Sequence, residues 1–131
     1  MNKNISFRFV VENKNVFIYA LAGEKEVGHA WFSYNHKEGR AWLYYVGVQK
    51  GYSRQGIGSV LLKLCEQKAS KMGAYNLQGW FYPNEYITPE ALKKFYVKNG
   101  YEMYWDEHLM VAKRLERKSY QETEEILSEL A

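Results

Sequence analysis

An apolar strand that passes through a glycine-marked turn directly into a helix constrains this chain more than any other feature. It is the segment over residues 46–62, VGVQKGYSRQGIGSVLL. Gly56 and Gly58 have no Cβ, so a ligand can approach the backbone closely, and the free N–H groups of the helix's first turn point towards that ligand. An anion is the natural occupant of such a turn. The segment therefore predicts a phosphate-binding turn.

Two common phosphate-binding patterns do not fit this turn. A P-loop has a Lys and a Ser or Thr directly after its second glycine, whereas Ile57 and Gly58 follow Gly56 here. A dinucleotide-binding turn has a third glycine, where this chain has Leu61, and an acidic residue about twenty positions later. Both are missing. A plain strand-to-helix turn, with glycines needed only for tight packing, is the alternative.

The pattern that remains resembles the GNAT acyltransferases: V-x-V, a short turn with a tyrosine, and then G-I-G-S-x-L-L. Residues 91–102 resemble a second box of that family, A-x-x-x-F-Y-x-x-x-G-Y, in which Tyr96 precedes Gly100 by four positions. The two boxes occur in the family's order, and the resemblance covers about residues 5–115.

This resemblance implies a fold and an activity. The fold is α/β (α+β), with a mixed, mostly antiparallel, splayed central sheet, a parallel strand–helix–strand unit and flanking helices. The activity is that of an N-acetyltransferase, in which acetyl-CoA is the acyl-donor substrate and a primary amine attacks it directly in a ternary complex. The amine, carried by a small molecule, a peptide or a protein, and the length of the acyl chain stay open.

Composition is consistent with one folded domain. The chain has 131 residues, of which 47% are hydrophobic and 17% aromatic, enough for a single core and too apolar for a disordered chain. The net charge of +3 suits an anionic cofactor, but no block of consecutive basic residues indicates nucleic-acid binding. Neither a secretory signal nor a membrane-length apolar run occurs, so we expect a cytoplasmic protein that does not bind membranes.

The residue pattern predicts a meander of strands, a strand–helix–strand unit, a second helix and a closing hairpin. Only Asn13–Asn15 joins the first two strands, where the family usually has one or two helices, so the acceptor side is either more open or covered by something else. Gly73 ends the first helix and Thr88 caps the second. The expected strands span residues 5–12, 16–21, 27–34, 41–48, 74–82, 101–105 and 109–115, and the expected helices span 59–72 and 88–99.

A short C-terminal segment, residues 119–131, follows the catalytic domain that we expect over residues 1–118. Ser119 and Glu122 form a capping-box pattern in front of an apolar stripe. Because so short a helix is marginal alone, we expect it to dock on its own sheet or on a second subunit. A homodimer through this helix or a sheet edge is therefore a candidate, and a frayed acidic tail is the alternative.

The resemblance also assigns the donor site. The main-chain amides of the turn hold the pyrophosphate, and Arg54 adds a side-chain charge. The backbone of Val46 and Val48 pairs with the pantetheine arm like an added strand, which requires a splayed or bulged strand end. Ser53 stands where the family has Arg or Gln, and Thr88 where it often has an asparagine, so a plain helix cap is the alternative role for Thr88. The predicted cofactor-binding residues are Val46, Val48, Ser53, Arg54, Gln55, Gly56, Ile57, Gly58, Ser59, Thr88 and Tyr96.

Tyr96 is the predicted catalytic residue. The family's tyrosine at this position lies beside the thioester sulfur, and a phenol with a pKa of about 10 is protonated at neutral pH, so it can donate a proton to the leaving thiolate. A helix aromatic packed on the sheet is the alternative. No general base is evident, because residues 42–45 lack the family's glutamate. The general base is therefore either solvent or one of five side chains: His29, His36, Glu85, Asp106 or His108.

Other chemistry is less strongly indicated. Cys65 lies on an apolar helix face, so we expect it in the core rather than as a nucleophile. Histidines and cysteine are scattered without ligand spacing, so we expect no metal. Aromatic side chains crowd the expected acceptor cleft and could stack on a peptide, an aromatic amine or a cation, with residues 82–87 as an acceptor loop. The alternative function is a non-catalytic interaction protein that binds a protein partner, while a single-stranded nucleic-acid binder lacks a recognisable motif.

Overall fold

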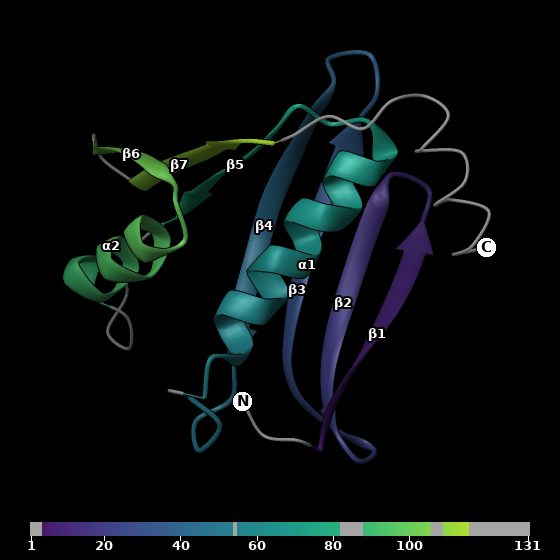
Figure 1. Cartoon of the computed structure of the whole chain (residues 1–131), viewed down its shortest axis with the longest axis vertical. Coiled ribbons are helices and arrows are strands. Elements are labelled where there is room, and N and C mark those ends of the chain that lie inside the picture. The colour runs from purple at the N-terminus through teal and green to yellow at the C-terminus, as the bar shows by residue number, and fades with distance from the viewer. Residues whose placement is uncertain (1–3, 54, 82–87, 106–108, 116–131) are drawn as a thin grey trace.

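The computed structural model describes residues 4–53, 55–81, 88–105 and 109–115, which form one mixed β-sheet and two helices (Figure 1). The elements are β1 Ile5–Glu12, β2 Asn15–Ala22, β3 Lys25–Asn35, β4 Arg40–Val48, α1 Ile57–Met72, β5 Asn76–Phe81, α2 Pro89–Lys98, β6 Glu102–Trp105 and β7 Leu109–Arg114. The strands lie in the order β1-β2-β3-β4-β5-β7-β6. Neighbouring strands are antiparallel except β4 and β5, which are parallel and are joined through α1.

This architecture confirms the predicted fold class and element order. Each observed boundary lies within two residues of the predicted one. Among the strand starts, those of β3 and β5 differ most, by two residues each. β5 starts later than predicted because the N–H groups of Ala74 and Tyr75 bond to Ala69 and Gly39 and not to a neighbouring strand. Neither described helix is both long and apolar enough to cross a membrane.

Tight turns hold the first four strands together. The turn between β1 and β2 uses Asn13 with φ 56°, and the next turn uses Gly23 with φ 66°. Asn13 and Lys14 alone separate β1 from β2, so the two strands follow one another without a helix, as the sequence predicted.

The core lies between α1 and one face of the sheet. Leu61, Leu62, Cys65 and Ala69 of α1 are fully buried. Burial raises the pKa of the Cys65 thiol, and the negative charge of Glu66 raises it further, so the thiolate that a nucleophile needs is disfavoured. The prediction of a core cysteine is confirmed. The sheet residues that face α1 are Val16, Ile18, Ala20, Val27, Ala30, Phe32, Ala41 and Leu43.

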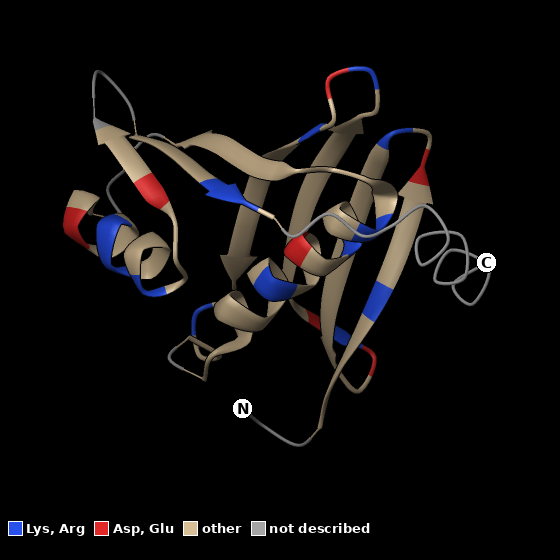
Figure 2. Cartoon of the chain, turned by 45° about the horizontal axis from the view of Figure 1, so that its top comes forward, with Lys and Arg blue, Asp and Glu red and all other residues tan. Residues whose placement is uncertain are grey.

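The opposite face of the sheet, called the outer face below, is aromatic. The rings lie 4.5–6.0 Å apart between centroids in two rows, Phe17–Trp31–Tyr44 and Tyr19–His29–Tyr45. In β2, β4 and β5 the only charged residue is Arg40, and Figure 2 shows the middle of the sheet almost without charge.

Candidate active site

The strands β4 and β5 separate halfway along β4. They pair from Arg40 with Asn76 as far as Leu43 with Gly79. Beyond this point β5 continues beside β7 and β4 continues beside β3. One edge of β4 up to Val48 therefore has no neighbouring strand within the described part of the chain, and its backbone groups need other partners.

A β-bulge accompanies this separation. The β3–β4 register places Trp31 opposite Tyr45 but Phe32 opposite Leu43, so Tyr44 is the extra residue. Tyr44 packs on Trp31 at 4.6 Å, and both tyrosines lie on the outer face, while Leu43 remains in the core. The predicted splayed and bulged strand end is present in the structure.

The turn after β4 leaves the start of α1 without a side-chain cap. Gly56 is the N-cap residue in the left-handed conformation, with φ 79° and ψ 6°, and the first turn has no acidic residue. The first intrahelical bond joins the Val60 N–H to the Gly56 carbonyl. The three amides before Val60 lie at the positive end of the helix dipole, which makes this turn suitable for an anion.

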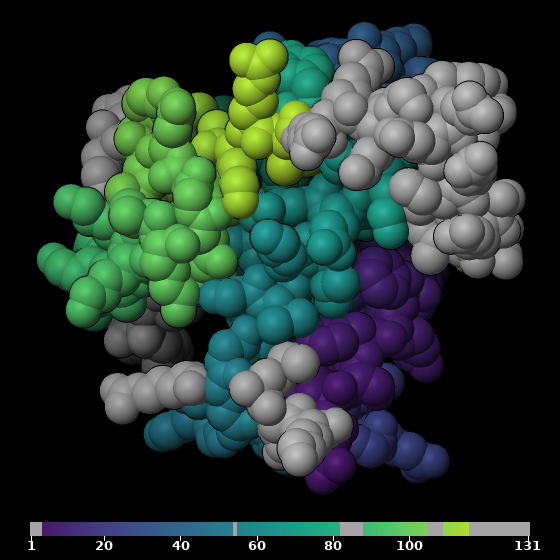
Figure 3. Space-filling view, viewed as in Figure 1, coloured from purple at the N-terminus to yellow at the C-terminus, as the bar shows by residue number. Residues whose placement is uncertain are grey.

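A cavity of about 340 Å³ lies between the end of β4, the start of α1 and α2. Gly58 forms part of its wall, and a Cβ on Gly58 would lie 3.3 Å from the Phe95 ring and 3.7 Å from Val48 Cγ2. Figure 3 shows a hollow between α2 and the first turns of α1. The lining residues are Tyr45, Val46, Gly47, Val48, Gly58, Phe81, Ala91, Leu92, Phe95 and Tyr96.

Tyr96 lies in this cavity and is 2% exposed. Its ring stacks on Phe81 at 5.1 Å and meets Phe95 and Tyr101 edge to face at 5.0 and 5.4 Å. Burial raises the pKa of its phenol, with a smaller contribution from the neighbouring Cys65, so the hydroxyl keeps its proton. No described residue forms a hydrogen bond with this hydroxyl. The packing role and a proton-donor role are therefore compatible in one side chain.

The other predicted donor residues differ in what their side chains do. Ser53 is exposed, and Gln55 Oε1 is buried without a hydrogen-bond partner among the described residues. Ser59 Oγ accepts a hydrogen bond from Asn99 Nδ2 at 3.2 Å, so this hydroxyl joins α1 to the end of α2. Thr88 is the N-cap of α2, where its Oγ1 accepts from the Ala91 N–H at 3.2 Å. Arg54 lies outside the described residues.

None of the described base candidates lines the cavity. His29 is on the outer face of β3, stacked on Tyr45 at 4.5 Å, and its Nδ1 lies 3.7 Å from Glu26 Oε2. His36 lies in the turn before β4, at the end of that strand remote from the cavity. Among the described residues no group of three His, Cys, Asp or Glu side chains is placed to hold a metal. The candidates Glu85, Asp106 and His108 lie outside the described residues.

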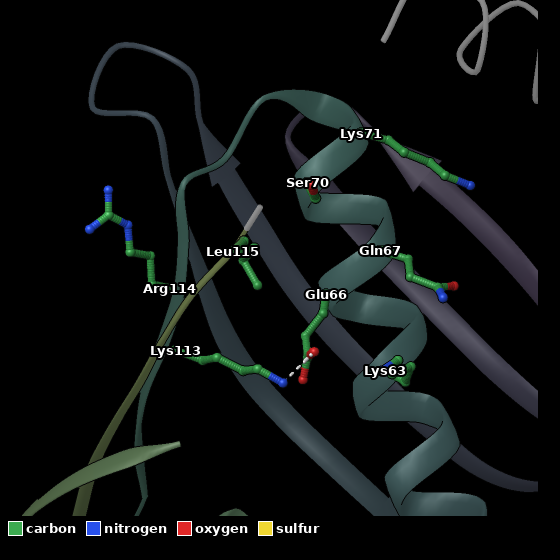
Figure 4. A pocket seen from close by; sticks show the side chains of 8 residues that line it. All are labelled: Lys63, Glu66, Gln67, Ser70, Lys71, Lys113, Arg114 and Leu115. Atoms are coloured by element: carbon green, nitrogen blue, oxygen red, sulfur yellow. Dashed lines mark hydrogen bonds and ion pairs between the residues drawn. The ribbon is translucent and has the colours of Figure 1, made fainter. Parts of the chain in front are cut away.

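A polar cluster that sequence reasoning missed joins α2 to α1 and β7. The Lys113 ammonium donates to Glu66 Oε1 and to the Asn99 carbonyl, both at 2.9 Å. The Tyr101 hydroxyl donates to Glu66 Oε2 at 2.9 Å. Figure 4 shows Glu66 and Lys113 pointing at each other. We call these four residues the Glu66 cluster. Because Tyr96 is the only fully buried residue of α2, the cluster is a main constraint on where α2 lies.

The sequence contains signals for this cluster. Lys113 lies between Val111 and Leu115 at a spacing of two residues, so a strand places all three side chains on the same, buried face. Glu66 follows Leu62 by one helical turn, so it interrupts the apolar side of α1. Lys71 and Arg114 also line the hollow beside the cluster but point away from the ion pair (Figure 4). The cationic groups therefore do not converge on a common anion.

A known protein family matches most of this chain. The model of the family described as acetyltransferase (GNAT) domain matches residues 10–103. A search of curated proteins found no significant match.

Solved acetyltransferase structures share the fold at low identity. A PaiA N-acetyltransferase from Thermoplasma acidophilum in complex with coenzyme A is 19% identical with a TM-score of 0.66, and the match covers 77% of this chain and 61% of that one. The ribosomal-protein-S18-alanine N-acetyltransferase from Escherichia coli is 16% identical with a TM-score of 0.69, over 84% of this chain and 75% of that one. An aminoglycoside 6'-N-acetyltransferase complexed with coenzyme A is 15% identical with a TM-score of 0.70, over 82% and 77%.

Proposed function

Because this chain belongs to the acetyltransferase (GNAT) family and takes acetyl-CoA as its acyl donor, we propose that it acetylates a primary amine by direct attack in a ternary complex. One observation carries the proposal: the unpaired edge of β4, the uncapped start of α1 and the Tyr96 phenol meet in one cavity. These are a strand edge, an anion site and a proton donor, which together match the three parts of an acyl thioester of CoA.

The turn holds the pyrophosphate in this proposal. The amides from Gly56 to Ser59 donate to phosphate oxygens, and the side chains of Ser53, Arg54 and Gln55 flank them. The Oε1 atom of Gln55 makes no hydrogen bond with a described residue, so this oxygen is available to a donor group of a ligand. The Thr88 hydroxyl caps α2 by accepting from the Ala91 N–H, and its own proton can still be donated to the pantetheine arm.

The pantetheine arm lies along β4. The backbone groups of Val46 and Val48 on the unpaired edge bond to its amides as an added strand would. The missing side chain of Gly58 leaves room for the arm between β4 and Phe95. The thioester then reaches Tyr96.

The bonds and protons of the transfer balance with Tyr96 as the proton donor and water as the proton acceptor. The amine nitrogen attacks the thioester carbon, the C–N bond forms, and the C–S bond breaks with its electron pair going to sulfur. Tyr96 gives its proton to the sulfur, the new amide nitrogen loses a proton to water, and the phenol recovers one from water. The apolar cavity that raises the pKa of Tyr96 also raises the proton affinity of a thiolate, which keeps the transfer feasible.

Calorimetry and a thiol assay test this function together. We expect acetyl-CoA to bind in the micromolar range, and free CoA thiol to appear only when a suitable amine from a panel is added. No binding of CoA or acetyl-CoA at about 1 mM, the upper end of usual KM values, would overturn the assignment. Binding without turnover of any amine or peptide would favour the alternative of a non-catalytic protein that binds a partner through the aromatic outer face.

A further inference from the structure

A second cavity, of about 400 Å³, lies on the outer face of the sheet and is lined by Trp42, Leu43, Tyr44 and Trp80. We propose that it is the acceptor subsite and that it holds the flat aromatic body of a monoamine, an arylalkylamine in chemical class. The proposal rests on the proposed function. It adds the substrate class, which neither the family nor the relatives' differing acceptors determine.

The position of this cavity connects it to the donor site. Its residues flank Leu43 and Gly79, the last pair before β4 and β5 separate. Trp80 lies on the outer face, whereas the next residue, Phe81, stacks on Tyr96 in the donor cavity. The two cavities therefore flank the same opening, with Trp80 on the outer face in one and Phe81 on the inner face in the other. An amine held on the outer face has a short path to a thioester held on the inner face.

The shape of the cavity suits a planar ring. Trp42 and Trp80 meet edge to face, with centroids 6.0 Å apart and planes at 88°, so their indoles form two perpendicular walls. Tyr44 is held by Trp31 and by a 3.2 Å hydrogen bond between its hydroxyl and Ser33 Oγ. Trp80 and Tyr44 are 51% and 50% exposed, which leaves aromatic surface for a ligand to cover.

The charge around the cavity favours a monoamine over a polyamine. None of the four lining residues is charged, and β2, β4 and β5 carry no carboxylate (Figure 2). A polycationic acceptor needs a carboxylate for each ammonium that it buries, and the described residues that line the cavity supply none. An acceptor with an aromatic body and a single amine can bind by stacking on the cavity walls, and its amine can reach the thioester through the opening between β4 and β5.

Steady-state kinetics with two probe amines tests the subsite. We expect 2-phenylethylamine to have a kcat/KM about tenfold or more above that of 1,4-diaminobutane, because one aromatic contact beyond simple burial is worth a large part of a tenfold affinity change. Trp80→Ala and Trp42→Ala should each raise KM for 2-phenylethylamine about tenfold and leave the Kd of acetyl-CoA unchanged. Trp80→Phe, which keeps a flat ring, should restore most of the loss.

Tyr104→Ala is the matched control, since Tyr104 is an exposed aromatic residue of β6 outside the cavity. It should change neither constant. Equal turnover of both amines, or a KM that the tryptophan variants leave unchanged while acetyl-CoA still binds, would overturn the subsite and leave the proposed function intact. Failure of acetyl-CoA to bind the unaltered protein would overturn the proposed function, and the subsite with it. An unchanged Kd of acetyl-CoA in each variant shows that the variant is folded.

Discussion

Single residues set the geometry at the opening of the sheet. The Tyr45 ring packs directly over Gly47, in the space that any side chain at Gly47 would need. A Cβ on Gly28 would lie 2.9 Å from the Gly47 carbonyl oxygen, closer than real Cβ atoms approach. Both glycines therefore permit the close pairing of β3 with β4 beside the bulge, where the aromatic rings of the outer face and the donor cavity meet.

Tyr96 is the residue on which catalysis depends in this proposal. Tyr96→Phe keeps the rings that pack around it and removes only the hydroxyl, which forms no hydrogen bond with a described residue. We therefore expect kcat to fall by about 10²-fold or more, as for a lost general acid, with the Kd of acetyl-CoA and the thermal stability nearly unchanged. Tyr104→Phe, which removes an exposed phenol that donates to Glu102, is the control. Normal turnover in Tyr96→Phe would exclude the acid role.

At the scale of the element, the phosphate turn depends on one left-handed glycine. Gly56→Ala and Gly23→Ala both place a side chain at positive φ, 79° and 66°, in space with no atom within 4 Å. Each should reduce the free energy of unfolding by about 1–2 kcal/mol. Only Gly56→Ala should weaken acetyl-CoA binding, by about tenfold or more, since its Cβ stands where the phosphates approach. Calorimetry and urea unfolding measure both effects, and equal Kd values for acetyl-CoA in the two variants would contradict a phosphate-binding role for this turn.

The Glu66 cluster helps to hold α2 against α1, together with the hydrogen bond between Ser59 and Asn99. Lys113→Met leaves the Glu66 carboxylate buried with the Tyr101 hydroxyl as its remaining described donor. We expect the free energy of unfolding to fall by about 1–3 kcal/mol and KM for acetyl-CoA to rise, because α2 forms one wall of the donor cavity. Lys63→Met removes an exposed lysine from the same hollow and is the control.

A second substitution separates charge from packing in this cluster. Adding Glu66→Gln to Lys113→Met removes the unpaired charge, so part of the lost stability should return in urea unfolding. A Lys113→Met variant as stable as the unaltered protein, with the same KM, would show that the ion pair does not hold α2.

At the scale of the whole molecule, three buried weak acids make the free energy of unfolding depend on pH in the alkaline range. Burial is the main cause that raises the pKa values of Cys65, Tyr96 and Tyr101. The folded chain therefore holds protons that the unfolded chain releases above the ordinary values of about 8.5 for Cys and about 10 for Tyr. The stabilisation is complete below those values and is lost as pH rises above them.

We expect the free energy of unfolding to be level near neutral pH and to fall above about pH 8.5, by up to about 1.4 kcal/mol per pH unit for each group that ionises. Urea unfolding at a series of pH values measures this. In Cys65→Ala the decline should begin nearer pH 10, where the phenols of the unfolded chain ionise. A stability that rises between pH 8.5 and 10.5 would contradict the burial of these groups.

Much of this fold was predictable because its signals are local. Runs of β-branched and aromatic residues between polar turns specify β2 and β4, and Gly56 and Gly73 mark both ends of α1. The sequence also placed Tyr96 and the phosphate turn in one family pattern, and the structure brings Tyr96 and Gly58 to one cavity. Their roles in binding and catalysis remain predictions. Lys113 and Glu66 were missed because they are 47 positions apart, and a charged residue on a buried face identifies no partner by itself.

The sequence by itself determined the elements, their order and the turn that suits a phosphate, because these follow from periodicity and from glycines within a few residues of one another. Only the tertiary structure decided where β4 and β5 separate, that Tyr44 is the bulged residue, and that Trp42 and Trp80 form a cavity opposite the Tyr96 side. The separation and the cavity depend on the register of β4 with β5, whose paired residues are more than thirty positions apart, and the bulge depends on the register of β3 with β4. Both registers are set by the packing of the whole sheet on α1 and not by any local pattern.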